Sequence, residues 1–312
     1  MMFQRECIVG KKLLPELSVA IAAAAWGLFW IPLRAFNSNG LTGSWAVLAQ
    51  FLIPLLILIP FALLRLIQKK PTGIGQYRTG ILVGVAVSLY LESLLLTDVA
   101  RSLILFYVMP TWATMLEVFV MNHPLTKSRG ISLGLGLLGM TVIIFNSNTL
   151  TVSLNLGDLL ALLSGILFSF GVLRVRQANE TSVFEQLFAF FLFSSVASFF
   201  FTLLPVSSLG TPPASNQIRQ LAPWLVLTAA GFFIPTMLVI YWGSRHVNPG
   251  RLGILLQIEA VVGLGSAALL ADEPFGVRQA IGAVFVIGAG FIEVLANSEM
   301  VSMGNRQIFT TE

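Results

Sequence analysis

The sequence predicts an all-α integral membrane protein with ten transmembrane helices arranged as two inverted five-helix repeats. Of its 312 residues, 56% are hydrophobic and only 10% are charged, whereas soluble domains carry about 25% charged residues. Ten apolar segments follow one another along the chain, and the basic residues between them alternate between two sides. A weak internal repeat also relates the two halves of the chain at an offset of 150 residues.

Each segment has close to the length that crosses a bilayer core of about 30 Å at about 1.5 Å per residue. The first segment follows basic residues, as in a signal peptide, but its apolar run is longer than a signal core, so we expect a membrane helix. Asp158 is expected to cap the sixth helix, and Gly130 with Gly134 to allow close packing of the fifth. The expected helices are residues 17–33, 45–64, 81–97, 102–121, 130–145, 159–173, 186–204, 221–243, 252–271 and 280–296.

The basic residues predict the orientation. The side that holds the N-terminus carries 14 Lys and Arg residues, and the other side carries 4. Because cytoplasmic connections hold the excess of positive charge, we expect both tails, residues 1–16 and 298–312, in the cytoplasm and the protein in the inner membrane of the cell. This bias accounts for the net charge of +4, so no nucleic-acid partner is expected. Cys7 is the only cysteine, which excludes an internal disulfide and a cysteine metal cluster.

The internal repeat pairs the fourth segment with the ninth. Arg101 and Pro124 are 23 residues apart, and so are Arg251 and Pro274. An odd number of crossings separates the two segments, so they run in opposite directions, as in the inverted repeats of many secondary transporters. Such repeats place a binding site near the midplane of the membrane. The two repeats are expected at residues 17–146 and 156–297.

Several short motifs lie near the starts and ends of these helices. They are Ala25-Trp26-Gly27, Val99-Ala100-Arg101 followed by Tyr107-Val108-Met109-Pro110, Leu156-Gly157-Asp158, and Ala271-Asp272-Glu273-Pro274. In this order and spacing they resemble the drug/metabolite transporter superfamily, specifically its ten-helix branch built from two EamA domains. One departure is the corner Asn122-His123-Pro124, where that family usually has a Gly-Glu-Pro-like sequence.

The resemblance implies a secondary transporter that works by alternating access and moves a small metabolite, such as an amino acid or a related solute, outward. It also implies a central cavity lined by helices one, three, four, six, eight and nine, which makes Trp26, Tyr107, Ser169 and Gln257 candidate lining residues. The expected partners are a small-molecule substrate, protons if transport is coupled to them, and the lipid bilayer; no cofactor or metal is expected. The alternative is a non-transporting membrane scaffold or sensor subunit with the same fold.

Glu259 is the strongest candidate for a functional residue. A charge in the middle of a transmembrane helix costs about 2.5–3.5 kcal/mol on insertion scales, so it needs a reason. Glu259 shares a helix face with Gly263 and Ser266, which favours an inward position. There it serves proton coupling or binds a cationic substrate; alternatively, it is a protonated structural residue that is hydrogen-bonded between helices. Met109 occupies the equivalent position in the first repeat. An acid that only the shared fold required would be expected in both repeats, so its presence in one repeat favours a functional role.

Two further acids in apolar segments, Glu92 and Glu117, are candidates for function. Glu92 is placed about 9 Å from the outer end of the third helix, where it lines an outer vestibule or simply reaches water. Glu117 shares a stripe of the fourth helix with Tyr107 and Pro110, and the proline frees a backbone carbonyl and can bend the helix. Either these residues line a polar path through the membrane, or Glu117 simply lies at the cytoplasmic boundary of the helix. No GxSxG, HExxH or GxxxxGK[ST] motif occurs, so we expect no enzyme.

Overall fold

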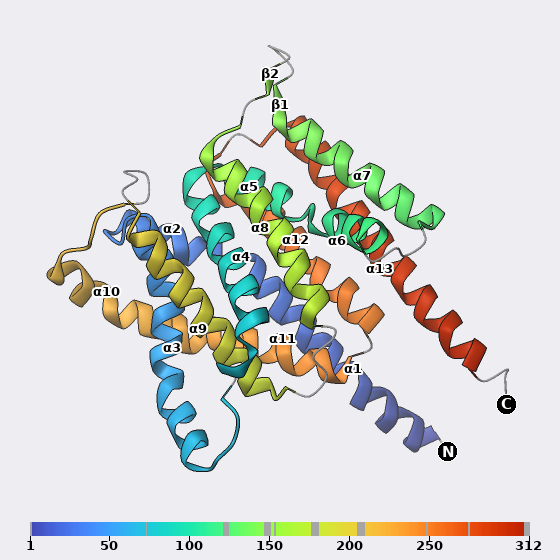
Figure 1. Ribbon diagram of the computed structural model, residues 1–312, viewed down its shortest axis with the longest axis horizontal. Helices are drawn as coiled ribbons and strands as arrows, with labels where there is room; N and C mark the ends of the chain where they lie inside the picture. Colours follow the sequence, from blue (N-terminus) through green and yellow to red (C-terminus); the bar gives the residue numbers. More distant parts are fainter. Residues whose placement is uncertain are drawn as a thin grey trace.

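The computed structural model describes residues 2–72, 74–120, 125–146, 151–152, 154–175, 181–204, 210–247, 249–273 and 275–308. Most of this chain is helical (Figure 1). The helices of the first half are α1 (Met2–Gly27), α2 (Trp30–Ser38), α3 (Ser44–Ile67), the 3-10 turn η1 (Ile74–Gln76), α4 (Tyr77–Leu96), α5 (Val99–Phe106), α6 (Met109–Phe119) and α7 (Lys127–Ile144). Those of the second half are α8 (Leu156–Val175), α9 (Val183–Thr202), α10 (Ser215–Thr228), the π-helical η3 (Ala229–Phe233), α11 (Ile234–His246), α12 (Pro249–Leu270) and α13 (Val277–Ile308).

The described part of the chain contains ten apolar helical spans, one at each predicted position. Seven are long and apolar enough to cross a membrane: Leu14–Ser38, Ser44–Ile67, Tyr77–Leu96, Val99–Phe119, Lys127–Ile144, Val183–Thr202 and Ser215–His246. Three shorter apolar helices complete the set: Leu156–Gly171, Ile254–Leu270 and Val277–Ile292. The prediction of an all-α, multi-pass integral membrane protein is therefore confirmed.

Three of these spans are interrupted. The first is interrupted between α1 and α2, directly after Gly27. The fourth is interrupted between α5 and α6, and Pro110, in the first turn of α6, has no N–H for the Phe106 carbonyl. The eighth contains the π-helical turn η3, and Pro235 follows it in the first turn of α11. The bend predicted from Pro110 is therefore present.

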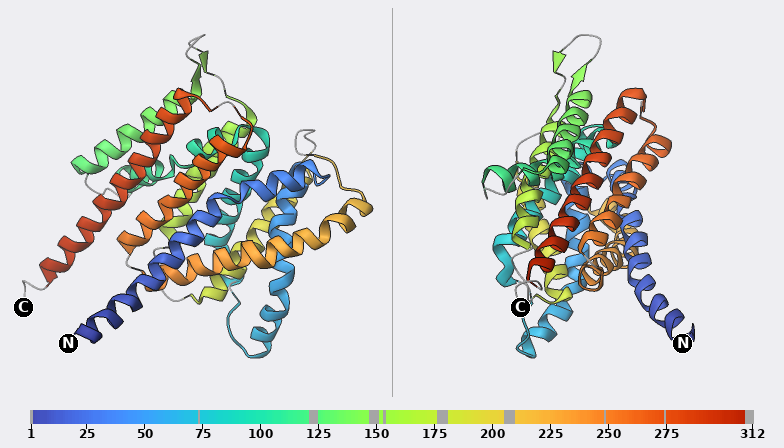
Figure 2. Two further views of the ribbon diagram at one scale, coloured as in Figure 1. Left: turned by 180° about the vertical axis from the view of Figure 1, so that it is seen from behind. Right: turned by 90° about the vertical axis from the view of Figure 1, so that its right-hand side faces the viewer.

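The two ends of the bundle are distinct (Figure 2). The N-terminal end of α1, the C-terminal end of α13 and the connection between α3 and α4 lie at one end, which we call the tail end. At the opposite end lies a short antiparallel pair, β1 (Phe145–Asn146) with β2 (Thr151–Val152). We call this second end the hairpin end.

The two halves pack against each other as an inverted repeat requires. Helix α3 packs on α9, and α7 packs on α13, so the second and fifth spans each contact their own counterpart. The contact of α1 with α12 is matched by the contact of α8 with α5 and α6. The contact of α4 with α8 is likewise matched by that of α11 with α1. When each helix in these contacts is replaced by its counterpart in the other repeat, the result is again an observed contact. The core therefore lies between the two repeats.

Glycines allow the closest of these contacts, but not the two that the sequence suggested. A Cβ atom on Gly130 or Gly134 would meet nothing within 4 Å, so the expected close packing at that pair is wrong. The tight contact lies further along α7, where a Cβ on Gly139 would be 3.0 Å from the carbonyl oxygen of Gly282 in α13. The two helices therefore touch through backbone, as small residues permit in membranes. The corner at residues 122–124 and Pro274 lie outside the described residues.

Candidate functional site

A cavity of about 370 Å³ lies at the centre of the bundle. Its lining comes from α1, α4, α5, α6, α8, α9, α11 and α12. These helices include all six spans that were expected to surround a cavity, with the seventh span, α9, in addition. Seven aromatic side chains form much of the wall: Trp26, Tyr90, Phe106, Tyr107, Phe168, Phe190 and Tyr241. The polar lining residues are Gln76, Thr79, Thr181, Gln186, Ser244, Gln257 and Glu259.

Glu259 lies on α12 in the deep part of this cavity. The helix carries it there because α1 and α12 cross at Gly27 and Gly263: a Cβ on Gly27 would be 2.6 Å from the Glu259 carbonyl oxygen and 3.0 Å from the Gly263 nitrogen. Only a residue without a side chain allows the two backbones to approach so closely. One turn further along α12, Ser266 accepts a 3.0 Å hydrogen bond from the Trp30 indole N–H. This face of α12 is therefore turned into the protein.

The Glu259 carboxyl lies beside two tyrosines. The Tyr107 hydroxyl is adjacent to it, although the two groups do not form a hydrogen bond of good geometry. Tyr90, from α4, is also close enough for an electrostatic interaction with Glu259. Both tyrosine hydroxyls are buried, and neither has a hydrogen-bond partner of good geometry among the described residues. The acid is thus surrounded by phenol groups that can donate a hydrogen bond to it or to a bound solute.

The aromatic side chains of the wall also contact one another. Tyr90 and Phe106 are stacked, with ring centroids 4.1 Å apart and an interplanar angle of 16°. Phe190 meets Trp26 edge-on at 6.2 Å and Tyr241 at 6.4 Å. Edge-to-face arrangements such as those of Phe190 are favourable for aromatic pairs. The wall is therefore supported by ring contacts among its own side chains.

The cavity extends from the middle of the bundle to the tail end. Gln76 ends η1 and Thr79 lies in the first turn of α4, while Gln186 is near the start of α9, Ser244 near the end of α11 and Leu252 near the start of α12. All four of these helix ends lie at the tail end of the bundle (Figures 1 and 2). Most of the polar lining is thus at the mouth, and the aromatic side chains and Glu259 lie deeper.

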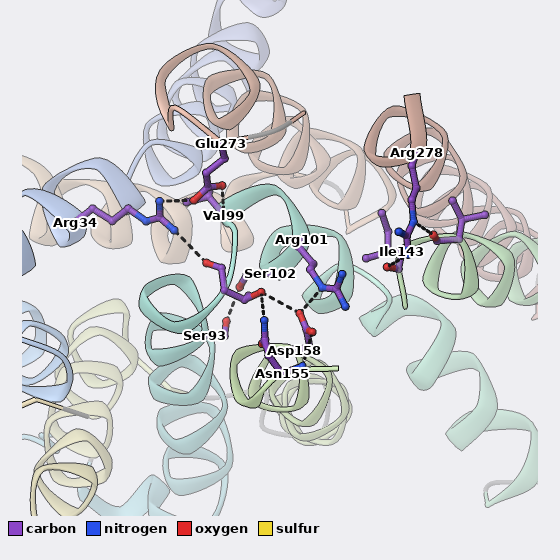
Figure 3. A network of polar contacts seen from close by, with 12 residues as sticks. Arg34, Ser93, Val99, Arg101, Ser102, Ile143, Asn155, Asp158, Glu273 and Arg278 are labelled. Atoms are coloured by element: carbon purple, nitrogen blue, oxygen red, sulfur yellow. Dashed lines mark hydrogen bonds and ion pairs between the residues drawn. The ribbon is translucent and has the colours of Figure 1, made fainter. Parts of the chain in front are cut away.

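Polar contacts between the two repeats hold the hairpin end together (Figure 3). Arg34, from α2, forms an ion pair with Glu273, which follows α12. The same guanidinium donates 3.0 Å hydrogen bonds to the carbonyl oxygens of Leu94 and Thr97. The Glu273 carboxylate also accepts a 2.6 Å hydrogen bond from the Val99 N–H. Partial burial raises the pKa of Glu273, and the neighbouring Arg34 opposes that rise.

A second ion pair in this network joins Arg101 of α5 to Asp158 of α8, with 2.6 Å between Nε and Oδ1. Asp158 is fully buried, and it does not cap its helix as the sequence suggested. Asn155 does so: its side-chain oxygen accepts from the Asp158 N–H, while Asp158 accepts from the Asn155 N–H, both at 2.9 Å. The Arg278 guanidinium of α13 donates 2.6 Å hydrogen bonds to the carbonyls of Val142 and Ile143. The contacts of Arg101 and of Arg278 cross from one repeat to the other.

Four of the seven predicted site residues line the cavity: Trp26, Tyr107, Gln257 and Glu259. Gln257 reaches it from α12, where Gly290 of α13 leaves space for the amide; a Cβ there would be 2.7 Å from Nε2. The other three predicted residues lie elsewhere among the described residues.

Ser169 lies behind the wall, on α8. Its hydroxyl is 2.7 Å from the Met109 carbonyl and 2.8 Å from the Gly165 carbonyl, so it ties α8 to the interrupted fourth span. Glu117 is 2.6 Å from the Arg129 guanidinium in a buried ion pair between α6 and α7. Glu92 is fully buried on α4 beside Ser44 of α3, and neither of its oxygens forms a hydrogen bond of good geometry with a described residue. We leave these three residues out of the proposed binding site.

The other aromatic residues of the wall could not be singled out by sequence pattern. Tyr90, Phe106, Phe168 and Phe190 line the cavity, but each lies in an apolar segment rich in similar residues. Tyr241, near the end of α11, lines the cavity as well. Tyr241 is four residues after Met237, so the two side chains share one helix face, and Met237 also lines the cavity.

Comparison with known proteins adds three findings. A model of the EamA-like transporter family matches this chain twice, over residues 13–145 and 155–294. Among solved structures, 24 chains match; one, described only as the crystal structure of a protein, is 17% identical and gives a TM-score of 0.55. That match covers 91% of this chain and 98% of the other. At this identity it shows a shared fold. No curated protein matches the chain.

Proposed function

The chain belongs to the EamA-like transporter family, which makes it a membrane transporter of the drug/metabolite type, and we propose that it is a secondary transporter that moves a small organic solute by alternating access. The observation that carries this proposal is the central cavity, whose lining reaches the tail end while the hairpin end is held by contacts between the repeats. A site near the midplane that opens to one face at a time is what alternating access requires.

Each end of the bundle has an ion pair that we propose as its gate, and the internal repeat relates the two pairs. At the hairpin end, Arg101 at the start of the fourth span pairs with Asp158 at the start of the sixth. At the tail end, Arg251, the repeat counterpart of Arg101, pairs at 2.6 Å with Glu16 near the start of the first span. The first pair is largely buried, whereas the side chain of Arg251 is 67% exposed. In our proposal, the two faces exchange these roles when the transporter turns to its other state.

The charge bias supports a cytoplasmic tail end. Most basic residues lie in the tails and connections at that end, and such connections are retained in the cytoplasm. The cavity described above is then open to the cytoplasm, and we propose export across the inner membrane as the direction. A reporter fused after residue 312 should read as cytoplasmic, and one inserted at residue 148 as external. The reverse result would overturn the orientation.

Glu259 is the proposed substrate and coupling residue. It is the one acid among the described residues that line the cavity, and amino acids or related amines are of a size that the cavity accepts. Protons are the proposed coupling ion, because a carboxyl that faces the cavity can exchange a proton with water whenever the cavity is open.

Solute flux through purified protein in lipid vesicles tests this function. Vesicles loaded with members of a panel of amino acids, amines and organic acids should show saturable counterflow of at least one labelled solute. We expect Glu259→Gln to lose this flux and its pH dependence. Asp272→Asn is the matched control, because it makes the same acid-to-amide change at an exposed position. If no solute of the panel moves, a scaffold or sensor role is favoured instead.

A further inference from the structure

We propose that the cavity selects monovalent organic cations that carry a flat, apolar body. This inference rests on the transport function proposed above and specifies the substrate class of the same site. It comes from three features of the lining: the single acid at depth, the lack of a basic counterpart among the described lining residues, and the aromatic side chains around the acid.

The charges of the lining favour a positive solute. Glu259 is the one charged side chain among the described residues of the wall, and no Lys, Arg or His accompanies it there. An ionised carboxylate in such surroundings lacks a counter-charge, which a bound cation supplies. The carboxylate of an anion or of an amino acid would instead lose its water without gaining a cationic partner. The arginines at the hairpin end are held by Glu273 and Asp158.

The aromatic side chains favour a cation of a particular shape. Tyr107 and Tyr90 lie beside Glu259, and Trp26 precedes the glycine at which α1 touches α12. Faces of Trp and Tyr attract organic ammonium groups through their π-electrons. The Tyr90 and Phe106 rings, stacked at 4.1 Å, offer a flat surface for the body of the solute. The volume of 370 Å³ lies at the small end of the about 300–1,000 Å³ typical of ligand sites.

A proton and a cation must then compete for the same carboxyl. The titratable groups that face Glu259 among the described residues are Tyr107 and Tyr90, and Tyr241 lines the same cavity. None of these three carries a positive charge in any protonation state. A proton on Glu259 removes the one negative charge of the wall, so cation binding should weaken as the pH falls.

Three solutes that share a phenyl ring and differ in charge provide the test. They are phenethylamine (a cation), phenylalanine (a zwitterion) and 3-phenylpropionate (an anion). Binding to the purified full-length protein is measured as the ligand-dependent rise in its thermal transition. We expect phenethylamine to bind at least about tenfold more tightly than phenylalanine, a difference that corresponds to about 1.4 kcal/mol. We expect no binding of 3-phenylpropionate.

The pH dependence is measured on the wild-type protein, so it does not depend on a variant that folds. Phenyltrimethylammonium, whose charge is permanent, should bind more weakly at about pH 5 than at about pH 8, because a carboxyl titrates and the ligand does not. In Glu259→Gln, if it folds, this pH effect should be absent.

Equal or tighter binding of phenylalanine, or any binding of 3-phenylpropionate, would overturn the cation inference. Failure of both cations to bind would also overturn it. In each case, counterflow of another solute in vesicles would leave the transport function standing. Conversely, cation binding without flux of any solute would refute transport, because binding alone does not require alternating access.

Discussion

Replacing Gly27 with Ala tests how the cavity is built. The added Cβ would lie 2.6 Å from the Glu259 carbonyl oxygen, 3.0 Å from the Gly263 nitrogen and 3.2 Å from the Val262 Cβ. Ordinary van der Waals contact begins at 3.4 Å, so α1 and α12 must separate by about 0.8 Å. Two of the three atoms belong to the backbone of a helix and cannot rotate away. The change therefore displaces the helix that carries Glu259.

The expected cost is about 1–3 kcal/mol, the range for an added methyl group in a packed interior. Part of it is offset by about 0.5–1 kcal/mol, because Ala is favoured over Gly within a helix. Gly265→Ala is the control: Gly265 lies on α12, the helix that Gly27 contacts, and a Cβ there would meet nothing within 4 Å. That control should show only the helix-propensity gain.

The assay is the thermal transition of the two variants in one detergent at one heating rate, since unfolding of such proteins is commonly irreversible. Gly27→Ala should unfold at a lower temperature than wild type and Gly265→Ala at the same or a higher temperature. Solute binding should weaken in Gly27→Ala alone. If the two variants were equally stable and bound solute equally well, the close crossing of α1 and α12 would not be what positions Glu259.

Two further substitutions separate structural residues from the site. Glu117→Gln leaves the buried Arg129 without this carboxylate and should destabilise the protein by about 3–5 kcal/mol. The double replacement of Glu117 and Arg129 by Leu should recover much of that loss in a denaturation assay; no recovery would show that the pair is not the cause. Ser169→Ala removes the hydrogen bond to the Met109 carbonyl and should cost about 1 kcal/mol. Its solute affinity should remain near that of wild type, and a large loss of affinity would return Ser169 to the binding site.

The number and order of the spans were predictable because each span is an apolar run with a length set by the bilayer. The interruptions were less so. Pro110 indicates one of them through its missing N–H, but the interruption after Gly27 lies at a close contact with α12, more than 200 residues away. Hydropathy carries no information about such a contact. For the same reason, the pair Gly130 and Gly134 suggested packing that Gly139 provides instead.

The deep part of the site was predictable from the cost of burying an acid. Glu259 has no counterpart in the first repeat, and a charge at that depth needs a use. The same argument did not separate Glu259 from Glu117. Helical spacing shows that Glu117 is on the same helix face as Tyr107, but it does not show which residue of another helix lies opposite Glu117. Arg129, which neutralises Glu117, comes from the next helix. Tertiary contacts, not spacing, thus decide which acid faces the cavity.

The proposal that the cavity opens to the two faces in turn is tested most directly by cysteine accessibility. In a Cys7→Ser background, Leu256→Cys places a thiol in the cavity wall, and a membrane-impermeant thiol reagent is applied from either face. We expect reaction from the tail side. When Arg34→Gln and Glu273→Gln remove one of the two ion pairs described at the hairpin end, reaction from the hairpin side should rise severalfold. A thiol that never reacts from the hairpin side, in that variant or with a transported solute present, would contradict alternating access through this cavity.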